Sequence, residues 1–285
     1  MMPFVSTPRG ESMAREERKM TMKDMPKDRL YKYYSLSGIE SAIKDNTLKW
    51  SLLSEVNDPF EAIPAGWDKT SIKQCIPDYQ VEDLAHIDAL FDAEKVKELI
   101  SQITSFVSFS ECANKILMWA HYAEKFTGAC LEFSTEIIQR EIDCLERVTY
   151  AKPDEERKRC PLPYDDRGDN NPEYQKRVRE FLAFKASEWA YEEEWRLIVP
   201  PMAKIIRCKR EGDKYILVSE IPQGAVTKLI FGYNMPTPTR LALAKQIRVK
   251  HPECKFARIV LDSKLFMLSV DDLDVDAVEV AALGK

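Results

Sequence analysis

The chain is divided into many short segments with strand-type patterns, and this division most constrains its fold. Such segments recur from RLYKYYSL near residue 30 to KLFMLSV near residue 270. A few helical stretches separate them, but the βαβ rhythm of a doubly wound sheet is absent, as are G-x-G-x-x-G and G-x-x-x-x-G-K motifs. We therefore predict an α+β fold with mixed, mostly antiparallel strands and flanking helices. The composition, 45% hydrophobic and 31% charged, is that of an ordinary globular domain.

The domain organisation follows from where these patterns begin and stop. Residues 1–27 are polar and lack a sustained apolar period, so we predict a flexible leader there. Residues 28–285 are expected to form a single globular domain. Its least regular stretch, 152–172, contains four prolines and runs of charge, which predicts a mobile surface loop. Helices are predicted at 39–44, 69–104, 114–125, 173–189 and 237–250.

Composition narrows the classes of partner. The net charge of −5 gives no strong signal for nucleic-acid binding, which would need a basic face. No apolar run approaches the ~18 residues of a membrane span, and no secretion signal is present. The seven cysteines lack C-x-x-C spacing, which favours reduced thiols, and with only three histidines no metal site is expected. We expect a cytoplasmic protein with no membrane partner.

The segment WAYEEEWRLIV, residues 189–199, places three adjacent glutamates before an apolar run. If a strand begins at Glu192, then Glu192, Glu194 and Arg196 share one face of it. Burying carboxylates is costly unless they are paired. Two interpretations stay open: Glu194 pairs with Arg196 or a nearby lysine at a solvated strand end, or the carboxylates face a pocket and act on a substrate.

The segment MWAHYAEKFTG has a helical pattern and contains two residues that are candidates for a ligand site. His121 can change its charge near neutral pH, and Tyr122 can stack on a flat ligand. A helix that simply packs on the core would explain both residues equally well. This segment therefore indicates the wall of a pocket or an ordinary core element.

Three shorter segments are weaker signals. In RLYKYYSL, Arg29 or Lys32 could bind an anionic group such as a phosphate, or the lysine could snorkel from a half-buried strand. SFS places Ser108 and Ser110 on one strand face. NDPFE, residues 57–61, is at least a good turn.

Taken in order, the segments LYKY, NDPFE, SFSE, MWAHYA, W-x-Y-E-x-E-W-R and IFG resemble a bacterial and phage-borne family, the domain of unknown function numbered twenty-nine seventy-one. The resemblance runs from about Leu30 to about Gly232, and the MWAHYA and glutamate–arginine blocks are its most specific pieces. Members often carry arginine directly after YKY, where this chain has Tyr34.

The motif layout is also similar, more remotely, to the ADP-ribosyltransferase plan, with a basic or polar first strand, a Ser-x-Ser strand and a late Glu-x-Glu strand. This resemblance implies that NAD is the nucleotide used, and that Glu194 stabilises an oxocarbenium-like ribosyl intermediate while Glu192 positions the acceptor. The residues implied in binding the nucleotide are Lys32, Arg29, Ser108, Ser110, His121, Tyr122 and Arg196.

Whether the protein is an enzyme stays open from the sequence. One hypothesis is an NAD-using ADP-ribosyltransferase or NAD glycohydrolase, such as a toxin or phage-defence effector; the transferase would modify an unknown macromolecular acceptor. A second is a metal-dependent nuclease that uses Glu188, Glu192, Glu194 and Lys185. A third is a non-enzymatic module that binds a small ligand or a protein. The active-site hypotheses require the candidate side chains to converge on one cleft.

Overall fold

The protein is described by a computed structural model that covers residues 26–62, 98, 100–102, 104–142, 144–151, 172–200 and 202–283. Nearly all of the predicted leader, most of the predicted helix at 69–104 and nearly all of the predicted loop at 152–172 lie outside these residues.

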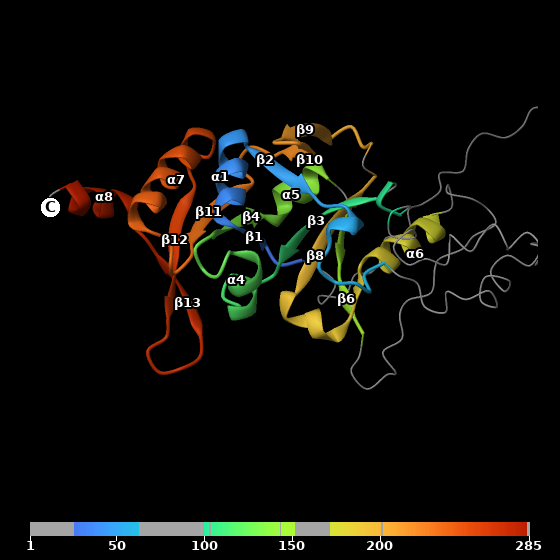
Figure 1. Cartoon of the computed structure of the whole chain (residues 1–285), viewed down its shortest axis with the longest axis horizontal. Coiled ribbons are helices and arrows are strands. Elements are labelled where there is room, and N and C mark those ends of the chain that lie inside the picture. The colour runs from blue at the N-terminus through green and yellow to red at the C-terminus, as the bar shows by residue number, and fades with distance from the viewer. Residues whose placement is uncertain are drawn as a thin grey trace, which may run out of the picture.

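Figure 1 shows the elements in chain order from β1 to α8. The strands are β1 (Arg29–Tyr34), β2 (Thr47–Trp50), β3 (Ser105–Ser110), β4 (Ala129–Ser134), β5 (Leu145–Arg147), β6 (Thr149–Tyr150), β7 (Phe184–Lys185), β8 (Glu194–Val199), β9 (Arg207–Glu211), β10 (Lys214–Glu220), β11 (Val226–Phe231), β12 (Lys255–Leu261) and β13 (Leu268–Asp272). The α-helices are α1 (Leu36–Asp45), α4 (Ile116–Tyr122), α5 (Thr135–Glu141), α6 (Pro172–Leu182), α7 (Thr237–Lys250) and α8 (Val275–Leu283). Two short 3-10 helices are η1 (Leu53–Glu55) and η4 (Ser187–Glu192).

The described strands build one large sheet and two small ones. The large sheet has eight strands in the order β13-β12-β11-β4-β1-β3-β8-β5. Its neighbours are antiparallel except for β11 and β12, which are parallel. A three-stranded sheet, β2-β10-β9, and a parallel pair, β6-β7, complete the set. The α+β class with mixed, mostly antiparallel strands is therefore confirmed.

The two faces of the large sheet are buried by different helices. In β1, Tyr34 belongs to one core cluster and Tyr33 to another, because side chains alternate along a strand. Figure 1 shows α1 and α7 on one side of the sheet and α4 on the other. The first core contains residues of α1, α5 and α7, namely Ile39, Ile138 and Leu243. The second contains Met118 and Trp119 of α4.

The helix predicted at 39–44 is confirmed, since it lies within α1 (Leu36–Asp45), and other helix predictions were wrong mainly at their ends. Helix α7 spans Thr237–Lys250, as predicted. The helix predicted at 173–189 ends at Leu182 instead, because Phe184 and Lys185 pair with β6. The helix predicted at 114–125 ends at Tyr122.

The early end of α4 has a local cause. The residues that follow, from Glu124 to Phe126, have positive φ, so they cannot continue a helix. The chain then reaches Gly128, where a Cβ atom would lie 2.0 Å from the carbonyl oxygen of Tyr34. The turn therefore brings the end of α4 against β1.

Among the helices that the structure describes, none combines the length and apolar character needed to cross a bilayer.

Candidate functional site

A cleft opens on the sheet where β1 and β3 separate. The two strands are registered through one pair, Tyr31 with Ser110. No other pair joins these two described strands, and the side-chain ammonium of Lys32 donates to the carbonyl oxygen of Ser108 at 3.3 Å. A cavity of about 110 Å³, which we call the carboxylate lobe, lies there. Its lining residues are Tyr31, Lys32, Tyr33, Ser108, Phe109, Ser110, Met118, Tyr122, Lys185, Glu192 and Glu194.

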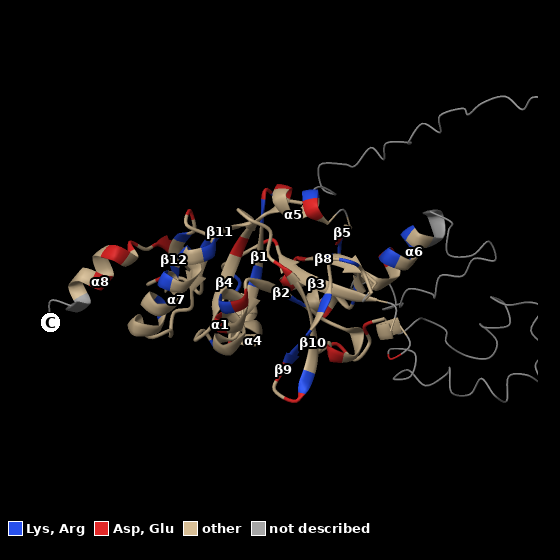
Figure 2. Cartoon of the chain, turned by 90° about the horizontal axis from the view of Figure 1, so that it is seen from above, with Lys and Arg blue, Asp and Glu red and all other residues tan. Residues whose placement is uncertain are grey.

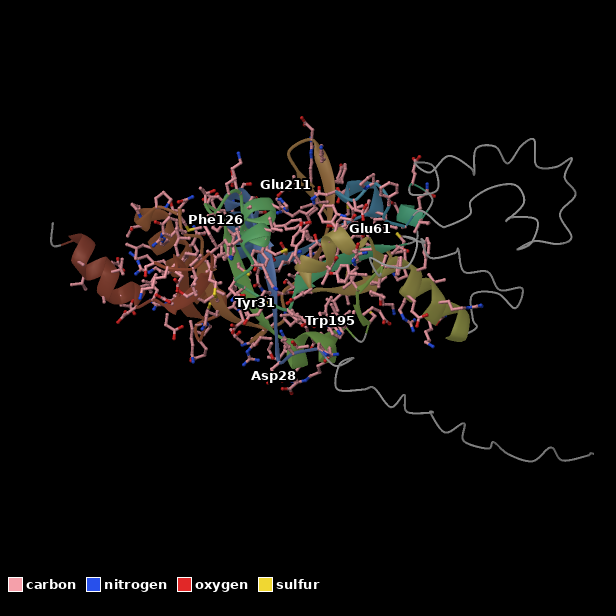
Figure 3. The ribbon with its side chains drawn as sticks, turned by 90° about the horizontal axis from the view of Figure 1, so that it is seen from below. Asp28, Tyr31, Glu61, Phe126, Trp195 and Glu211 are labelled. Carbon is pink, nitrogen blue, oxygen red and sulfur yellow. The ribbon has the colours of Figure 1, made fainter. Side chains whose placement is uncertain are left out.

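A second cavity of about 180 Å³ adjoins the first. It contains residues of the NDPFE segment, so we call it the turn lobe. Tyr31, which lines the carboxylate lobe, and Glu61, which lines the turn lobe, are both labelled in Figure 3. The side chains shared by the two lobes are Lys32, Ser108, Tyr122 and Lys185. The other residues of the turn lobe are Ser51, Glu55, Val56, Asn57, Asp58, Glu61, Phe106, Trp189 and Arg196.

Strand register explains why the two serines meet the acidic segment. In the antiparallel pair β3–β8, Ser110 is opposite Glu194 and Ser108 is opposite Arg196. Opposed residues project to the same face of a sheet. Trp195, between the two charged residues, points into the apolar core instead. The segment therefore has one face on the cleft and one in the interior.

Glu194 is buried and fully paired. Its two carboxylate oxygens accept from Arg196 Nε at 2.8 Å and Nη2 at 3.1 Å, and Lys185 Nζ lies 2.8 Å away. The side chains of Glu194 and Arg196 are only 4% and 1% exposed. The predicted pairing of Glu194 with Arg196 is thus present, but the alternative that placed this pair at a solvated strand end is wrong.

Glu192 reaches the same cleft from a different element. The prediction that the strand begins at Glu192 is wrong: η4 ends there, and Glu193 adopts left-handed backbone (φ 46°) before β8 begins. Glu192 accepts from the Tyr122 hydroxyl at 2.5 Å and from Lys185 Nζ at 2.7 Å. Glu193 contacts Lys115 and Cys112 outside the cleft.

The two cleft carboxylates have opposite pKa shifts. Burial raises the pKa of Glu192, an effect that Lys185 only partly offsets. Burial would also raise the pKa of Glu194, but Arg196 and Lys185 together hold it well below its usual range. Such a divergence between neighbouring acids is typical of catalytic pairs, although ion-pair networks also produce it.

Lys32 is the third cation of the cleft, and its surroundings differ from those of the other two. Within the described chain its one hydrogen bond goes to a carbonyl, and it forms no ion pair. Burial lowers the pKa of Lys32 to about 8, an effect that Glu194 partly opposes. Its ammonium also lies 5.6 Å from the ring centroid of Tyr34. A half-buried ammonium without a direct acidic partner is suited to an anionic ligand.

The structure does not bring every predicted residue into this cleft. Arg29 is exposed and lies near Glu132 at the start of β1, two residues before Tyr31, which is the first residue of β1 that lines the cleft. His121 is exposed and bonds the Tyr191 hydroxyl at 2.9 Å, because neighbouring helical residues point in different directions. Arg196 lines the turn lobe, where it holds carboxylates.

Sequence reasoning did not assign two residues that organise the site. Lys185 was considered only for the nuclease hypothesis, and Glu61 only as part of a turn. Lys185 contacts Glu192 and Glu194, and it lies 3.7 Å from Glu61. Glu61 also forms an ion-pair contact with Arg196 at 2.5 Å. The sequence signal that could have identified Glu61 was the order of the motifs. NDPFE precedes the glutamate–arginine block both in this chain and in the family pattern that it resembles.

The cations also occupy the space between the acids. Lys185 Nζ sits between Glu192 and Glu194, where a divalent ion would have to bind in the nuclease hypothesis. Across the described residues, no group of three or more His, Cys, Asp or Glu side chains is arranged to hold a metal ion. Within the described residues, the two acids are instead paired by the Lys185 ammonium.

The fold and the cleft define an α+β domain with a buried network of acidic and basic side chains. Residues 118–197 match the family model described as "Protein of unknown function (DUF2971)". The predicted resemblance to this family is thus confirmed over a stretch that includes MWAHYA and the glutamate–arginine block. Comparison with curated proteins and with solved structures finds no match.

Proposed function

We propose that the protein is an enzyme that cleaves the bond between nicotinamide and ribose in NAD and transfers ADP-ribose to water or to a macromolecular acceptor. One observation carries this proposal: two buried carboxylates with opposite pKa shifts share a cavity with Lys32, a cation that has no acidic partner within the described residues. The remote similarity of the motif order to ADP-ribosyltransferases supports it.

The bond cleavage would place positive charge in the carboxylate lobe. When the ribose carbon–nitrogen bond breaks, both bonding electrons leave with the pyridinium nitrogen, and nicotinamide departs as a neutral molecule. The ribosyl group becomes an oxocarbenium-like cation. Glu194 is held as an anion by Arg196 and Lys185, so it can stabilise that cation without reorganising.

Glu192 is suited to the second half of the reaction. The incoming water or hydroxyl group forms a bond to the ribosyl carbon and loses a proton. A carboxylate whose pKa is raised accepts this proton more readily than an ordinary one. Tyr122 and Lys185 fix the orientation of Glu192 by hydrogen bonds to each of its oxygens.

Lys32 would anchor the phosphates of the substrate. Lys32 lines both lobes. A phosphate bound to it would therefore lie between one part of the substrate in the carboxylate lobe and another part in the turn lobe. A cavity of ~150 Å³ holds a benzene ring; the carboxylate lobe is smaller, at about 110 Å³, and shares lining residues with the turn lobe. The lobe is therefore suited to one end of a dinucleotide and not to the whole molecule.

Release of nicotinamide and transfer of label from adenine-labelled NAD test the proposal. We expect Glu194→Gln to lower the rate about 10²- to 10³-fold, as for loss of one stabilising group. Glu193→Gln is the matched control, because Glu193 belongs to the same triplet but contacts Lys115 outside the cleft.

Folding of each variant is checked by thermal unfolding, and Glu192→Gln provides a second test at a separate carboxylate. If the parent protein neither releases nicotinamide nor transfers label, the proposal is wrong. Binding of NAD without cleavage would instead favour a non-enzymatic ligand-binding module.

A further inference from the structure

The turn lobe is the part of the cleft that the proposed bond cleavage does not use. Glu192 and Glu194 line only the carboxylate lobe. The turn lobe instead contains an indole ring, the NDPFE turn and a phenyl ring. Its volume of about 180 Å³ exceeds that of the carboxylate lobe. It therefore has room for a flat ring system next to Lys32.

Trp189 supplies an aromatic surface in this lobe. It is partly exposed and lies in η4, which also carries Glu192. Lys185 Nζ lies 5.5 Å from the centroid of its ring. The ring centroids of Trp189 and Tyr191 are 6.2 Å apart, and the two ring planes make an angle of 38°. These contacts fix the indole ring beside the cleft. Indole rings stack readily on nucleic-acid bases, since each base has a π face.

Asn57 supplies a hydrogen-bonding group on the same lobe. Its side chain is exposed, and no described residue bonds its amide. The turn that carries it is held in place: Asp58 Oδ1 accepts from the Phe60 amide at 2.8 Å, and Glu61 N donates to the Asp58 carbonyl at 3.3 Å. A carboxamide offers one donor group and one acceptor, which match the N7 and amino groups of adenine.

We propose that the turn lobe binds the adenine base of a nucleotide, with the base on Trp189, its edge read by Asn57 and its phosphates on Lys32. The inference deepens the proposed function and rests on it for the position of the bond that is cleaved. Binding itself does not depend on cleavage, because ADP contains the adenine and phosphates but no nicotinamide.

Calorimetric titration of the full chain with ADP, GDP and inorganic pyrophosphate tests the inference. We expect ADP to bind at least tenfold more tightly than pyrophosphate, a difference of about 1.4 kcal/mol. ADP should also bind more tightly than GDP, because guanine presents two acceptors at the edge where adenine presents a donor and an acceptor.

Variants test whether the preference for ADP arises in the turn lobe. Trp189→Ala should lower ADP affinity to that of pyrophosphate, whereas Trp189→Phe should retain most of it. Asn57→Ala should remove the preference for ADP over GDP, and we expect this variant to fold like the parent because Asn57 is exposed and its amide bonds no described residue. Tyr215→Ala is the matched control, since Tyr215 is 72% exposed and lines neither lobe.

The outcomes separate this inference from the proposed function. If Trp189→Ala and Asn57→Ala both bind ADP like the parent, or if ADP binds no better than pyrophosphate, the adenine site is wrong even when NAD is cleaved. If ADP binding depends on Trp189 and Asn57 but NAD is not cleaved, the adenine site stands and the proposed function is wrong.

Discussion

Each charged side chain in the cleft takes its character from its immediate partners. Glu194 and Arg196 are close in sequence, yet their burial would be unfavourable without Lys185 and Glu61. Arg196 also donates to the carbonyl of Leu182 at 2.6 Å and lies 4.6 Å from the ring centroid of Phe106. A guanidinium suits this place because it donates in several directions within one plane.

Removing the central guanidinium should therefore be costly. Arg196→Met leaves Glu61 and Glu194 buried with only Lys185 to pair them, and we expect a loss of about 3–5 kcal/mol in the free energy of unfolding. Urea unfolding measures it. Arg140→Ala, which breaks an exposed pair with Glu136, should cost less than about 0.5 kcal/mol. A similar small cost for Arg196→Met would show that the network does not stabilise the fold.

The pKa of Lys32 gives a pH dependence with a definite sign. Its pKa is lowered to about 8, so the ammonium is mostly charged below that pH and mostly neutral above it. If ADP binds the charged form, its affinity should fall about tenfold between about pH 7 and about pH 9. Titration calorimetry across this range measures the change.

Lys32→Arg is the control for this titration. A guanidinium keeps its charge throughout the range, so the variant should bind ADP with little pH dependence. A parent affinity that stays constant, or that rises with pH, would contradict a role for Lys32 as the phosphate anchor.

At the scale of elements, close contact between backbones sets the shape of the cleft wall. The turn after α4 approaches β1 at Gly128, where a Cβ atom would lie 2.0 Å from Tyr34 O. Strand β1 carries Lys32 and α4 carries Tyr122, so this contact fixes two lining residues relative to each other. A backbone atom cannot move aside as a flexible side chain can.

Gly128→Ala should therefore lower the free energy of unfolding by about 3 kcal/mol or more. Gly212 offers a matched comparison: a Cβ there meets nothing within 4 Å, but its φ of +60° makes alanine unfavourable by about 1 kcal/mol. Chemical unfolding of both variants compares the two causes. Equal losses would indicate that the chain relaxes easily around residue 128.

At the scale of the whole molecule, the cleft exists only when distant segments meet. Its lining residues come from β1, β3, α4, β7, η4 and β8 and from the NDPFE turn. Charged side chains outside the cleft are more widely spaced than those of the buried network. Figure 2 shows basic residues on β9 and β10 and acidic residues on α8, away from the segments that form the cleft. Unfolding separates the cleft segments and should therefore destroy any ligand site between them.

Ligand binding should accordingly stabilise the fold. ADP at a hundred times its dissociation constant is expected to raise the free energy of unfolding by about 2.7 kcal/mol, since it binds the native state alone. Scanning calorimetry with increasing ADP measures the shift in melting temperature. Lys32→Met should show a much smaller shift, and an unchanged melting temperature of the parent would contradict a nucleotide site.

Local patterns were sufficient for part of this structure. The alternation in SFVSFS and in the EWRLIV segment predicted β3 and β8, since a strand has a strict period of two. The same period predicted that Glu194 and Arg196 share a face. Motif order indicated the family over the matched region. The exact start of β8 was missed because Glu193 takes a left-handed backbone that no periodic pattern signals.

The sequence by itself determined that β3 and β8 are strands, which of their faces is apolar and that Glu194 has Arg196 beside it. Only the tertiary structure decided that Lys185 and Glu61 complete the charge network, that Lys32 faces the cleft, and that Arg29 and His121 do not. The physical reason is one of range. Side-chain alternation is set within a few bonds, whereas burial and pairing of a charge depend on segments brought together by packing across the fold.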